Sequence, residues 1–505
     1  MFAGRRRCSI FFASATAFLL GVQLALLSIE SYRPSSNYSF LERELSTFSR
    51  PKTHSKRKSR RGRKKTDRKL VGSFNGFDLY YHNETSVHSS VQCVGENYQE
   101  KNAWMHRSCK FRHFCLDIST NEFVIFQSDE EKALQDELQH HDWVDASNVM
   151  NETVSIGGIN SKWMWSKGVP RLEWSPRVIH GELREYYALD PSVVWVPFHS
   201  MAAFNPGHLV WDDFLPIYTL LKLFQLFDDR QMLLMRYILP GEGMWATCDA
   251  NQEKKDTCHK MFQKFLPLMG LTDDYFSTSA DFRLDLNETA PTSKLICAAH
   301  GAAGLGMLTD HGLKKHGWEK RDYESMHNQG RGSMLWDFRN FMVSNVGLPV
   351  GNLPTKPPYK IVFSVASSTN PNRALLFDNQ TNALVQHFGD TIEVKRYVFK
   401  RLSAREQVKI ASEAAIFITV CGGGAVTATF LPHGAAAILY YAETGGSQGN
   451  RATGLPARLD WDLFNNMGYL RTHWLPSNTM DTDDDIDIFV KLVRHELDLI
   501  SHQDY

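Results

Sequence analysis

The C-terminal third of the sequence predicts an α/β fold built on a parallel, Rossmann-like sheet. Three observations support this prediction. Short apolar runs alternate with helical patterns after residue 358, one helix opens with a Ser–Glu capping pair, and three consecutive glycines separate an apolar run from a short helix. Alternating strands and helices with short loops favour parallel strands. Ligands of such sheets bind at the carboxyl ends of the strands.

The predicted elements of this region follow one another with short connections. Strands are expected at 360–366, 391–399, 416–420 and 436–441 because these runs are apolar and rich in β-branched residues. Helices are expected at 381–388 and from Ser403, whose side chain faces Glu406 three residues later, to 415. The Asp-rich run 481–487 is typical of a solvated start to a last helix.

The glycine turn, Gly422 to Gly424, lies between the 416–420 strand and a short helix. Glycine permits positive φ and close approach of a ligand to the backbone, and the helix start has N–H groups without helical acceptors. Such a turn suits a phosphate, although a tight turn without a ligand is the simpler alternative. The pattern matches neither the dinucleotide fingerprint nor the P-loop.

Arg373 follows the first predicted strand of the sheet, in the segment 367–373. It should therefore lie at the same sheet edge as the glycine turn. A guanidinium fork facing a helix N-terminus is a suitable arrangement for pyrophosphate. A D-x-D pattern, Asp460 to Asp462, follows the last predicted strand, where a structural role is expected in place of a metal–sugar-nucleotide site.

Upstream of residue 350 the predicted elements are more widely spaced. Strands are expected at 122–126, 193–198 and 233–239, a strand and turn at 295–307, and helices at 211–227 and 338–343, whereas the Trp-rich segment 155–176 indicates a loop. The proline-rich segment 349–358 is predicted to be the linker between two domains.

A histidine and two carboxylates flank the start of the 211–227 helix. His208 ends an Asn-Pro-Gly-His turn, and Asp212 and Asp213 follow it closely. Such a group can serve as a general base. The alternative is that the two acids cap the helix and complement its dipole.

The N-terminal 75 residues predict a membrane anchor and a tether. Residues 10–29 form an apolar run of the length that spans a bilayer, preceded by three arginines at 5–7 in the predicted cytosolic tail, 1–9. Residues 30–75 are predicted to be a disordered stem, because 50–69 hold 12 basic residues and one acid. The body of the chain is then expected in the lumen of the secretory pathway.

Length, charge and cysteine content agree with that topology. A chain of 505 residues exceeds a single core, so two domains are expected. The first 69 residues carry a net charge of +13 within a chain of net charge zero, which leaves an acidic body unsuited to nucleic acid.

Eight cysteines and several glycosylation sequons fit an oxidising compartment. Local disulfides are expected among Cys93, Cys109 and Cys115 and between Cys248 and Cys258, with Cys421 as the candidate free thiol. Sequons occur at Asn37, Asn83, Asn151, Asn287 and Asn379.

Four of these segments, in order, resemble glycosyltransferase family 61. They are the 205–213 turn and helix start, Arg373 with Asn379, the 403–415 helix, and residues 422–434, which are similar to the family's H-G-A-G-L-T-N-x-L-F-L-P-P-G stretch. The resemblance covers about residues 93 to 441. Through it, Asn379 would be a structural and buried residue.

The resemblance implies a GT-B-like pair of Rossmann-like domains, 76–350 and 351–505, with a cleft between them. It implies an inverting, metal-independent glycosyltransferase of the Golgi or endoplasmic reticulum membrane, single-pass type II. The donor would be a nucleotide sugar, UDP-linked, used as co-substrate without a further cofactor, and the acceptor a glycan or glycoprotein. Arg373, Gly422, Gly423, Gly424 and Thr427 would bind the donor.

On the acceptor side the resemblance makes His208, Asp212 or Asp213 the candidate base. Two residues depart from the family pattern. Cys421 stands where the family has His, and Val426 stands where the family has a hydroxyl residue, with Thr427 one position later. These departures favour the alternative, a catalytically inactive lumenal glycan- or nucleotide-binding protein that keeps the fold. An NAD-dependent oxidoreductase is excluded by the missing G-x-G-x-x-G with its downstream acid.

Overall fold

The computed structural model describes most of the chain after residue 68. The described residues are 69–83, 86–94, 107–128, 154–156, 173–200, 202–227, 231–237, 248–278, 282–304, 306, 330–366, 374–441, 449–450, 455–456, 458–477 and 480–502. They all belong to one compact unit that spans Asp67–Tyr505. None of the helices within these ranges is long and apolar enough to cross a membrane. The predicted anchor at 10–29 lies outside them.

The C-terminal part contains the predicted parallel sheet. Its five strands run in the order β16 (Ile392–Tyr397), β15 (Tyr359–Ser364), β17 (Ile416–Val420), β18 (Ala436–Tyr441) and β21 (Arg471–Pro476). Every neighbouring pair is parallel. The strand predictions at 416–420 and 436–441 are confirmed in their bounds, because these central strands are buried on both faces and are therefore continuously apolar.

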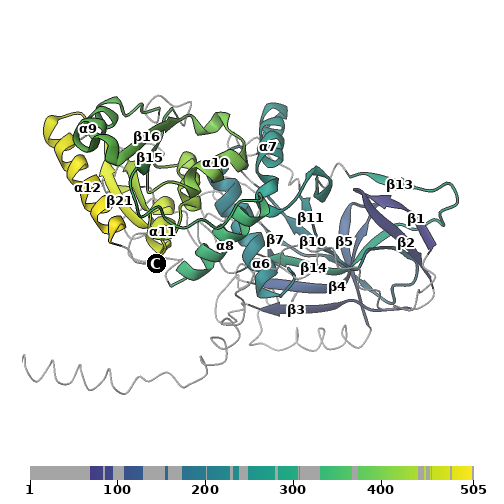
Figure 1. Ribbon diagram of the computed structural model, residues 1–505. Helices are drawn as coiled ribbons and strands as arrows, with labels where there is room; N and C mark the ends of the chain where they lie inside the picture. Colours follow the sequence, from purple (N-terminus) through teal and green to yellow (C-terminus); the bar gives the residue numbers. More distant parts are fainter. Residues whose placement is uncertain are drawn as a thin grey trace, which may run out of the picture. The chain divides into compact units, whose positions relative to one another are not determined.

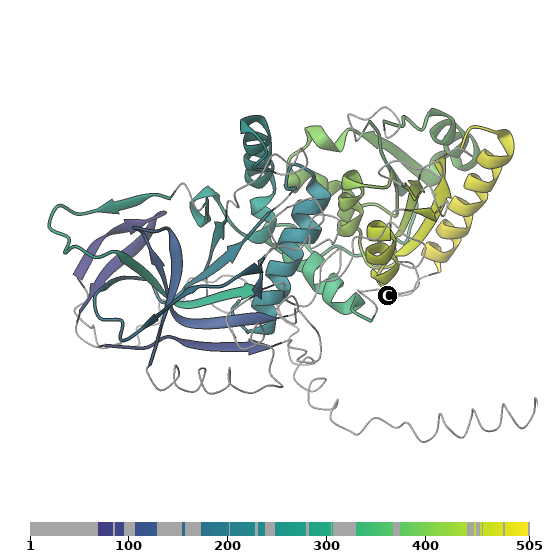
Figure 2. The same cartoon turned by 180° about the vertical axis from the view of Figure 1, so that it is seen from behind.

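Helices cover this sheet on both faces. Figures 1 and 2 show α9 (Asp378–Phe388) beside α12 (Asp483–Ser501) along one face, with α10 (Ala404–Ser412) toward the other. The predicted capping box is present: Ser403 accepts from the N–H of Glu406, and the Glu406 carboxylate accepts from the N–H of Ser403 at 2.8 Å. Helix α12 begins after the Thr482 cap with three acids in its first turn, as the sequence predicts.

The N-terminal part is built on a twelve-stranded mixed sheet. Its main path is β12 (Phe276–Thr278), β11 (Gln231–Arg236), β10 (Val193–Phe198), β14 (Leu295–Gly304), β9 (Tyr186–Leu189), β2 (Phe77–His82), β1 (Lys69–Phe74) and β13 (Leu284–Leu286). Branching from it are β3 (Ser90–Val94), β4 (Ser108–Asp117), β5 (Glu122–Gln127) and β8 (Arg177–His180). Two short pairs complete the strands, β6 (Val154–Ser155) with β7 (Glu173–Trp174) and β19 (Gly449–Asn450) with β20 (Leu455–Pro456).

This sheet differs from the expected Rossmann-like domain. The path from β12 to β9 is parallel throughout, but antiparallel strands join it through β4 and β2. The difference begins at Asn75 and Gly76, whose positive φ values of 46° and 81° form a tight hairpin between β1 and β2. Strand β1 starts at Lys69, so a regular strand lies within the segment 30–75 that the sequence predicts to be a disordered stem.

Five helices of the N-terminal part matter for the site. They are η2, a π-helix at His208–Phe214, its continuation α6 (Leu215–Leu223), α7 (Gln252–Phe265), the 3₁₀ helix η3 (Leu266–Met269) and α8 (Gly332–Asn345). The predicted 211–227 helix therefore begins three residues earlier and ends four residues earlier. A further 3₁₀ turn, η4 (Asp273–Tyr275), leads into β12. The proline-rich segment 349–358 connects α8 to β15 without regular structure, as predicted.

The three disulfides confirm two of the expected local pairings and correct the expectation for Cys115. Cys93 bonds Cys109, and Cys248 bonds Cys258, as local pairs. Cys115, however, bonds Cys297, 182 residues away, because β4 and β14 are antiparallel neighbours that place the two cysteines opposite each other. Cys421 is buried and takes no part in the disulfides of the described cysteines.

One hydrophobic core cluster includes residues from both sheets. It holds Val194 and Leu234 of the N-terminal sheet together with Ile418 and Ile438 of the C-terminal sheet. The two halves of the described chain therefore share buried apolar contacts across the 349–358 connection.

Candidate functional site

The glycine turn leaves β17 at its carboxyl end and opens the 3₁₀ helix η9 (Gly423–Phe430). Gly422 has φ of 107°, a conformation that favours glycine. Its N–H donates to Asp460 Oδ2 at 2.7 Å. Asp460 lies on α11 (Arg458–Asn466) and is 5% exposed. One N–H of the turn predicted to hold a phosphate is therefore bonded to an internal carboxylate.

The Asn-Pro-Gly-His turn lies directly against the glycine turn. Asn205 Oδ1 accepts from the N–H of Gly207 at 3.0 Å and lies so close to Gly423 that a Cβ there would be 1.9 Å from it. A Cβ on Gly207 would lie 3.1 Å from Gly423 Cα. Glycine at both positions allows the two turns, more than 200 residues apart in sequence, to approach this closely.

Two further contacts connect the same elements. Trp211 of η2 donates from Nε1 to Thr429 Oγ1 at 3.1 Å and meets the Phe464 ring edge-on at 5.4 Å. Arg339 of α8, fully buried, donates from Nη2 to the Phe430 carbonyl at 3.0 Å. Burial lowers the pKa of Arg339 to about 10, which keeps it charged at neutral pH. The C-terminal end of η9 is thus fixed against two N-terminal helices, η2 and α8.

His208 and Asp212 form a close pair on the π-helix. The distance from His208 Nδ1 to Asp212 Oδ2 is 2.7 Å; the Asp212 side chain is fully buried, while that of His208 is 26% exposed. When Nδ1 donates to the carboxylate, the basic lone pair of the imidazole lies on Nε2. Seven-residue π segments of this kind are frequent at functional sites.

Asp213 is separated from that pair by its own partners. It accepts a short hydrogen bond from the Ser200 hydroxyl. Burial raises the pKa of Asp213 well above its ordinary value of 3.8, and the neighbouring Asp212 carboxylate raises it further, against the opposing effects of Ser200 and Arg236. The sequence grouped the three residues, and the structure brings His208 and Asp212 together while directing Asp213 to Ser200.

A buried ion pair lies beside this cluster. Arg236, at the end of β11, donates from Nη2 to Asp249 Oδ1 at 2.7 Å, and both side chains are less than a tenth exposed. Burial lowers the pKa of His199 to about 4, so its imidazole is neutral at physiological pH. Arg236 Nη2 also lies 3.5 Å from the carbonyl of Ser200, the residue whose hydroxyl bonds to Asp213.

A cavity of about 340 Å³ opens beside the glycine turn. Gly423, Gly424 and Thr427 line it from η9, and Met261, Lys264 and Phe265 line it from α7. Lys400 contributes from η8 (Phe399–Arg401), and Asn205 from the upstream turn. Cys421 and Val426, the two departures from the family pattern, also line it.

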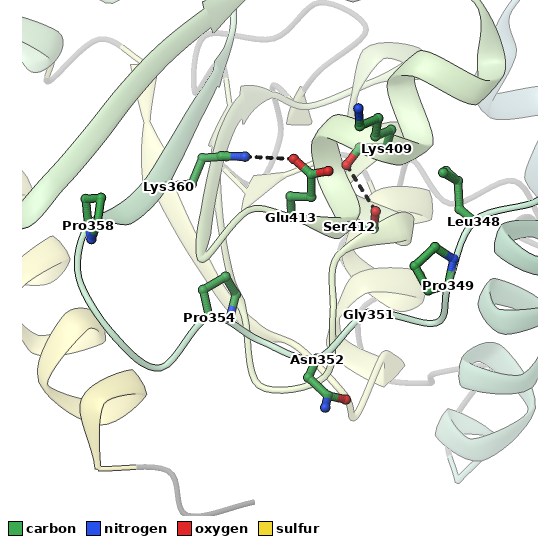
Figure 3. A pocket seen from close by; sticks show the side chains of 10 residues that line it. All are labelled: Leu348, Pro349, Gly351, Asn352, Pro354, Pro358, Lys360, Lys409, Ser412 and Glu413. Atoms are coloured by element: carbon green, nitrogen blue, oxygen red, sulfur yellow. Dashed lines mark hydrogen bonds and ion pairs between the residues drawn. The ribbon is translucent and has the colours of Figure 1, made fainter.

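A second cavity, of about 380 Å³, lies away from this site, beside the start of β15. Figure 3 shows its prolines opposite the Lys360–Glu413 ion pair, whose atoms are 2.7 Å apart. It lies at the amino ends of the parallel strands, the opposite edge from that which binds ligands in such folds.

The remaining predicted residues have mixed outcomes. Arg373 lies outside the described residues. Thr427 is buried and donates from Oγ1 to Gln407 Oε1 at 3.3 Å, so its hydroxyl has an internal acceptor. Asn379, expected to be buried, is exposed, with Nδ2 3.4 Å from Asp481 Oδ1. It occupies the first turn of α9, where the outer face meets solvent.

Metal ligands are not grouped in the described part of the chain, which holds no cluster of three or more His, Cys, Asp or Glu side chains suited to a metal ion. Asp460 and Asp462 are both buried. Asp460 accepts from the Gly422 N–H, and Asn466 donates to Asp462 Oδ1 at 3.2 Å, so both carboxylates make internal hydrogen bonds.

Asn205, Lys264, Lys400 and Asp460 were not predicted as site residues. Asn205 belongs to a turn that the sequence does identify, but the other three come from separate elements. Their positions depend on how helices that are distant in sequence pack together, and local sequence patterns do not predict this packing.

Comparison with known proteins gives little beyond this geometry. No protein-family model matches the sequence. No curated protein matches it at a significant level. Among solved structures, the chain is similar to the E. coli heptosyltransferase WaaC with ADP-2-deoxy-2-fluoro heptose, at 10% identity and a TM-score of 0.27 over 60% of this chain and 99% of that one. A likeness of this size leaves fold and function to be argued from the residues themselves.

Proposed function

We propose that this chain is a glycosyltransferase of the family 61 type, with a nucleotide sugar as donor. The observation that carries the proposal is the contact between two turns. Asn205 and Gly207 lie against Gly423, which brings the turn that leads into the His208–Asp212 pair beside the glycine turn at the carboxyl edge of the C-terminal sheet. A base beside a predicted phosphate-binding turn is the arrangement that sugar transfer from a nucleotide requires.

In the proposed reaction His208 is the general base. Its Nε2 takes the proton from an acceptor hydroxyl as that oxygen attacks C1 of the donor sugar and the bond from C1 to the diphosphate oxygen breaks. Attack from the opposite face inverts the anomeric centre. Asp212 holds the imidazole in the required tautomer and stabilises the imidazolium that forms.

The negative charge that gathers on the leaving diphosphate needs donors. Arg373, together with N–H groups of Gly423 and Gly424, is proposed to supply them in place of a metal ion. The N–H of Gly422 already bonds to Asp460, so it contributes only if that carboxylate moves. The donor is proposed to be UDP-linked, and the acceptor a glycan or glycoprotein.

The second candidate is an inactive binding protein with the same fold. Cys421 and Val426 favour it, because both depart from the family pattern and both line the cavity beside the glycine turn. A thermal-shift screen of the full-length protein with UDP- and GDP-sugars separates the two. Stabilisation with release of free nucleotide supports the transferase; stabilisation without turnover under any acceptor supports the binding protein.

The chain is further proposed to be a single-pass type II protein of the Golgi or endoplasmic reticulum, with residues 10–29 as the anchor. Three disulfides among the described cysteines are compatible with that lumen. Asn83, Asn287 and Asn379 are exposed and lie in sequons. Expression in a eukaryotic secretory pathway should therefore give a mass loss on enzymatic deglycosylation, and an unchanged mass would argue against a lumenal body.

A further inference from the structure

Two lysines line the cavity beside the glycine turn, and the proposed reaction assigns no role to them. Lys264 lines it from α7, in the N-terminal half, and Lys400 lines it from η8, in the C-terminal half. Lys264 Nζ donates to the Lys400 carbonyl at 3.2 Å, so the two residues are in contact across the halves. Gly423 and Gly424 of the glycine turn line the same cavity.

Lys264 is a partly desolvated cation. Its side chain is half-buried, and burial lowers its pKa, while the Glu406 carboxylate raises it. Glu406, however, accepts hydrogen bonds from both the hydroxyl and the N–H of Ser403, at 2.7 and 2.8 Å. An anion in the cavity would replace the hydration that Lys264 has lost, which is how desolvated lysines bind phosphate.

The rest of the lining is apolar and aromatic. Phe204, Phe265 and Phe399 line the cavity from three different parts of the chain, and Met261 of α7 lines it as well. Lys254 Nζ lies 4.3 Å from the centroid of the Phe204 ring, so a third lysine is next to one of the lining rings. A cavity lined by both lysines and aromatic rings matches a ligand that has phosphates at one end and a flat heterocycle at the other.

We propose that this cavity binds a nucleoside diphosphate. Lys264 and Lys400 bind the phosphate groups, and the aromatic side chains that line the cavity contact the base. This inference rests on the proposed function and adds to it a composite site: helix α7 of the N-terminal half supplies a charge to a donor expected in the C-terminal sheet. Uridine diphosphate is the probe that matches the proposed donor.

The test is isothermal calorimetry on the full-length protein with UDP, uridine and inorganic pyrophosphate. Lys264→Ala and Lys400→Ala should each weaken UDP binding roughly 10- to 100-fold, the range for losing one hydrogen bond to a charged group. Both variants should bind uridine as the parent does, because the base contacts remain. Lys264→Arg, which keeps the charge, should recover most of the lost affinity.

Two other lysines serve as matched controls. Lys260 lies one turn before Lys264 on α7 and is exposed, and Lys409 lines the cavity near β15 instead. Lys260→Ala and Lys409→Ala should bind UDP like the parent protein. Circular dichroism of each variant checks that the fold is kept, so that a loss of binding is assigned to the charge.

The outcomes separate this inference from the proposed function. UDP binding that survives both lysine substitutions overturns the lysine site and leaves the transferase intact. Pyrophosphate binding that depends on the lysines, without any response to UDP or nucleotide sugars, overturns the nucleoside diphosphate and the transferase together. If the protein binds neither UDP nor pyrophosphate, the inference is overturned. The proposed transferase activity is then decided by a separate measurement of nucleotide-sugar turnover.

Discussion

At the scale of single residues, the His208–Asp212 pair is the feature with the most direct chemical meaning. A buried carboxylate 2.7 Å from Nδ1 of a partly exposed imidazole fixes the tautomer and leaves the basic nitrogen on the other side of the ring. Asp213 is in a different environment. Its raised pKa favours the protonated, neutral carboxyl group, and that group accepts a hydrogen bond from Ser200.

His208→Ala should reduce kcat for sugar transfer by roughly 10²- to 10⁴-fold, the usual contribution of a positioned general base. Donor affinity, measured by calorimetry, should stay unchanged because His208 is proposed to act on the acceptor. Asp212→Asn should also lower kcat, and should alter the pH–rate profile, because an amide cannot stabilise the imidazolium.

His259→Ala is the control for that experiment, since His259 is exposed on α7. Equal kcat values for His208→Ala and the parent protein, with an active donor, would remove His208 from the mechanism.

A second residue-scale feature is the Glu496 carboxylate beneath β21. Its side chain is 1% exposed and bonds to Arg471 Nε at 2.6 Å and His473 Nε2 at 2.8 Å. Burial raises the pKa of Glu496, but the bonds from His473 and Arg471 outweigh it, and the pKa is lowered from 4.5. The stabilisation is therefore present above pH 4.5 and is lost as the pH falls through the lower folded value.

Glu496→Gln should lower the free energy of unfolding at pH 7 by roughly 1.5–3 kcal/mol, because it replaces hydrogen bonds to a charged group. The difference from the parent protein should shrink as the pH falls below 4.5. Urea unfolding at several pH values measures it, with the exposed Glu253→Gln on α7 as control. A pH-independent difference would contradict this account.

At the scale of elements, the approach of the two turns depends on Gly423. An alanine Cβ there would lie 1.9 Å from Asn205 Oδ1 and 2.8 Å from Asn205 Cγ, so one of the turns has to move. Gly423→Ala should destabilise the protein by about 1–3 kcal/mol, the cost of overpacking, and should also lower activity.

Asn205→Ala should rescue part of that loss, because it removes the atoms that the new Cβ meets. The double-mutant cycle in thermal unfolding should therefore give a favourable interaction energy between the two substitutions. Gly468→Ala is the control, since a Cβ there meets nothing within 4 Å. Additive losses would mean that the two turns are not in contact.

Local patterns in the sequence were sufficient for the C-terminal elements. The strand at 416–420, the Ser403–Glu406 capping box and the acidic start of α12 depend on neighbours within a few residues, and the structure confirms each. The mixed character of the N-terminal sheet was missed, although its Asn75-Gly76 hairpin signal is visible in the sequence.

Contacts between distant segments account for the rest of the site. Asp460 reaches Gly422 from 38 residues away, and Lys264 reaches Lys400 from 136 residues away. Cys297 pairs with Cys115 across 182 residues. Residue types and spacing carry no signal for such pairs, because the packing of distant helices decides them. The phosphate site predicted from the sequence therefore did not include Asp460, Lys264 or Lys400.

At the scale of the whole molecule, the hydrophobic core that both sheets share couples their stabilities. Trp211 belongs to η2 but bonds to Thr429 and packs on Phe464, both of which follow β17 in the chain. It is 2% exposed. Removing this side chain takes buried apolar area from both halves at once.

Trp211→Ala should therefore lower stability by roughly 3–5 kcal/mol, and the loss should be reported by both sheets. Hydrogen exchange followed by mass spectrometry measures it, with peptides that cover β10 and β17. Amides of both strands should exchange faster in the variant, by similar factors, because one opening exposes both. Faster exchange confined to β10 would show that the two sheets open independently, and a site assembled from both halves would then lack the rigid support that transfer chemistry requires.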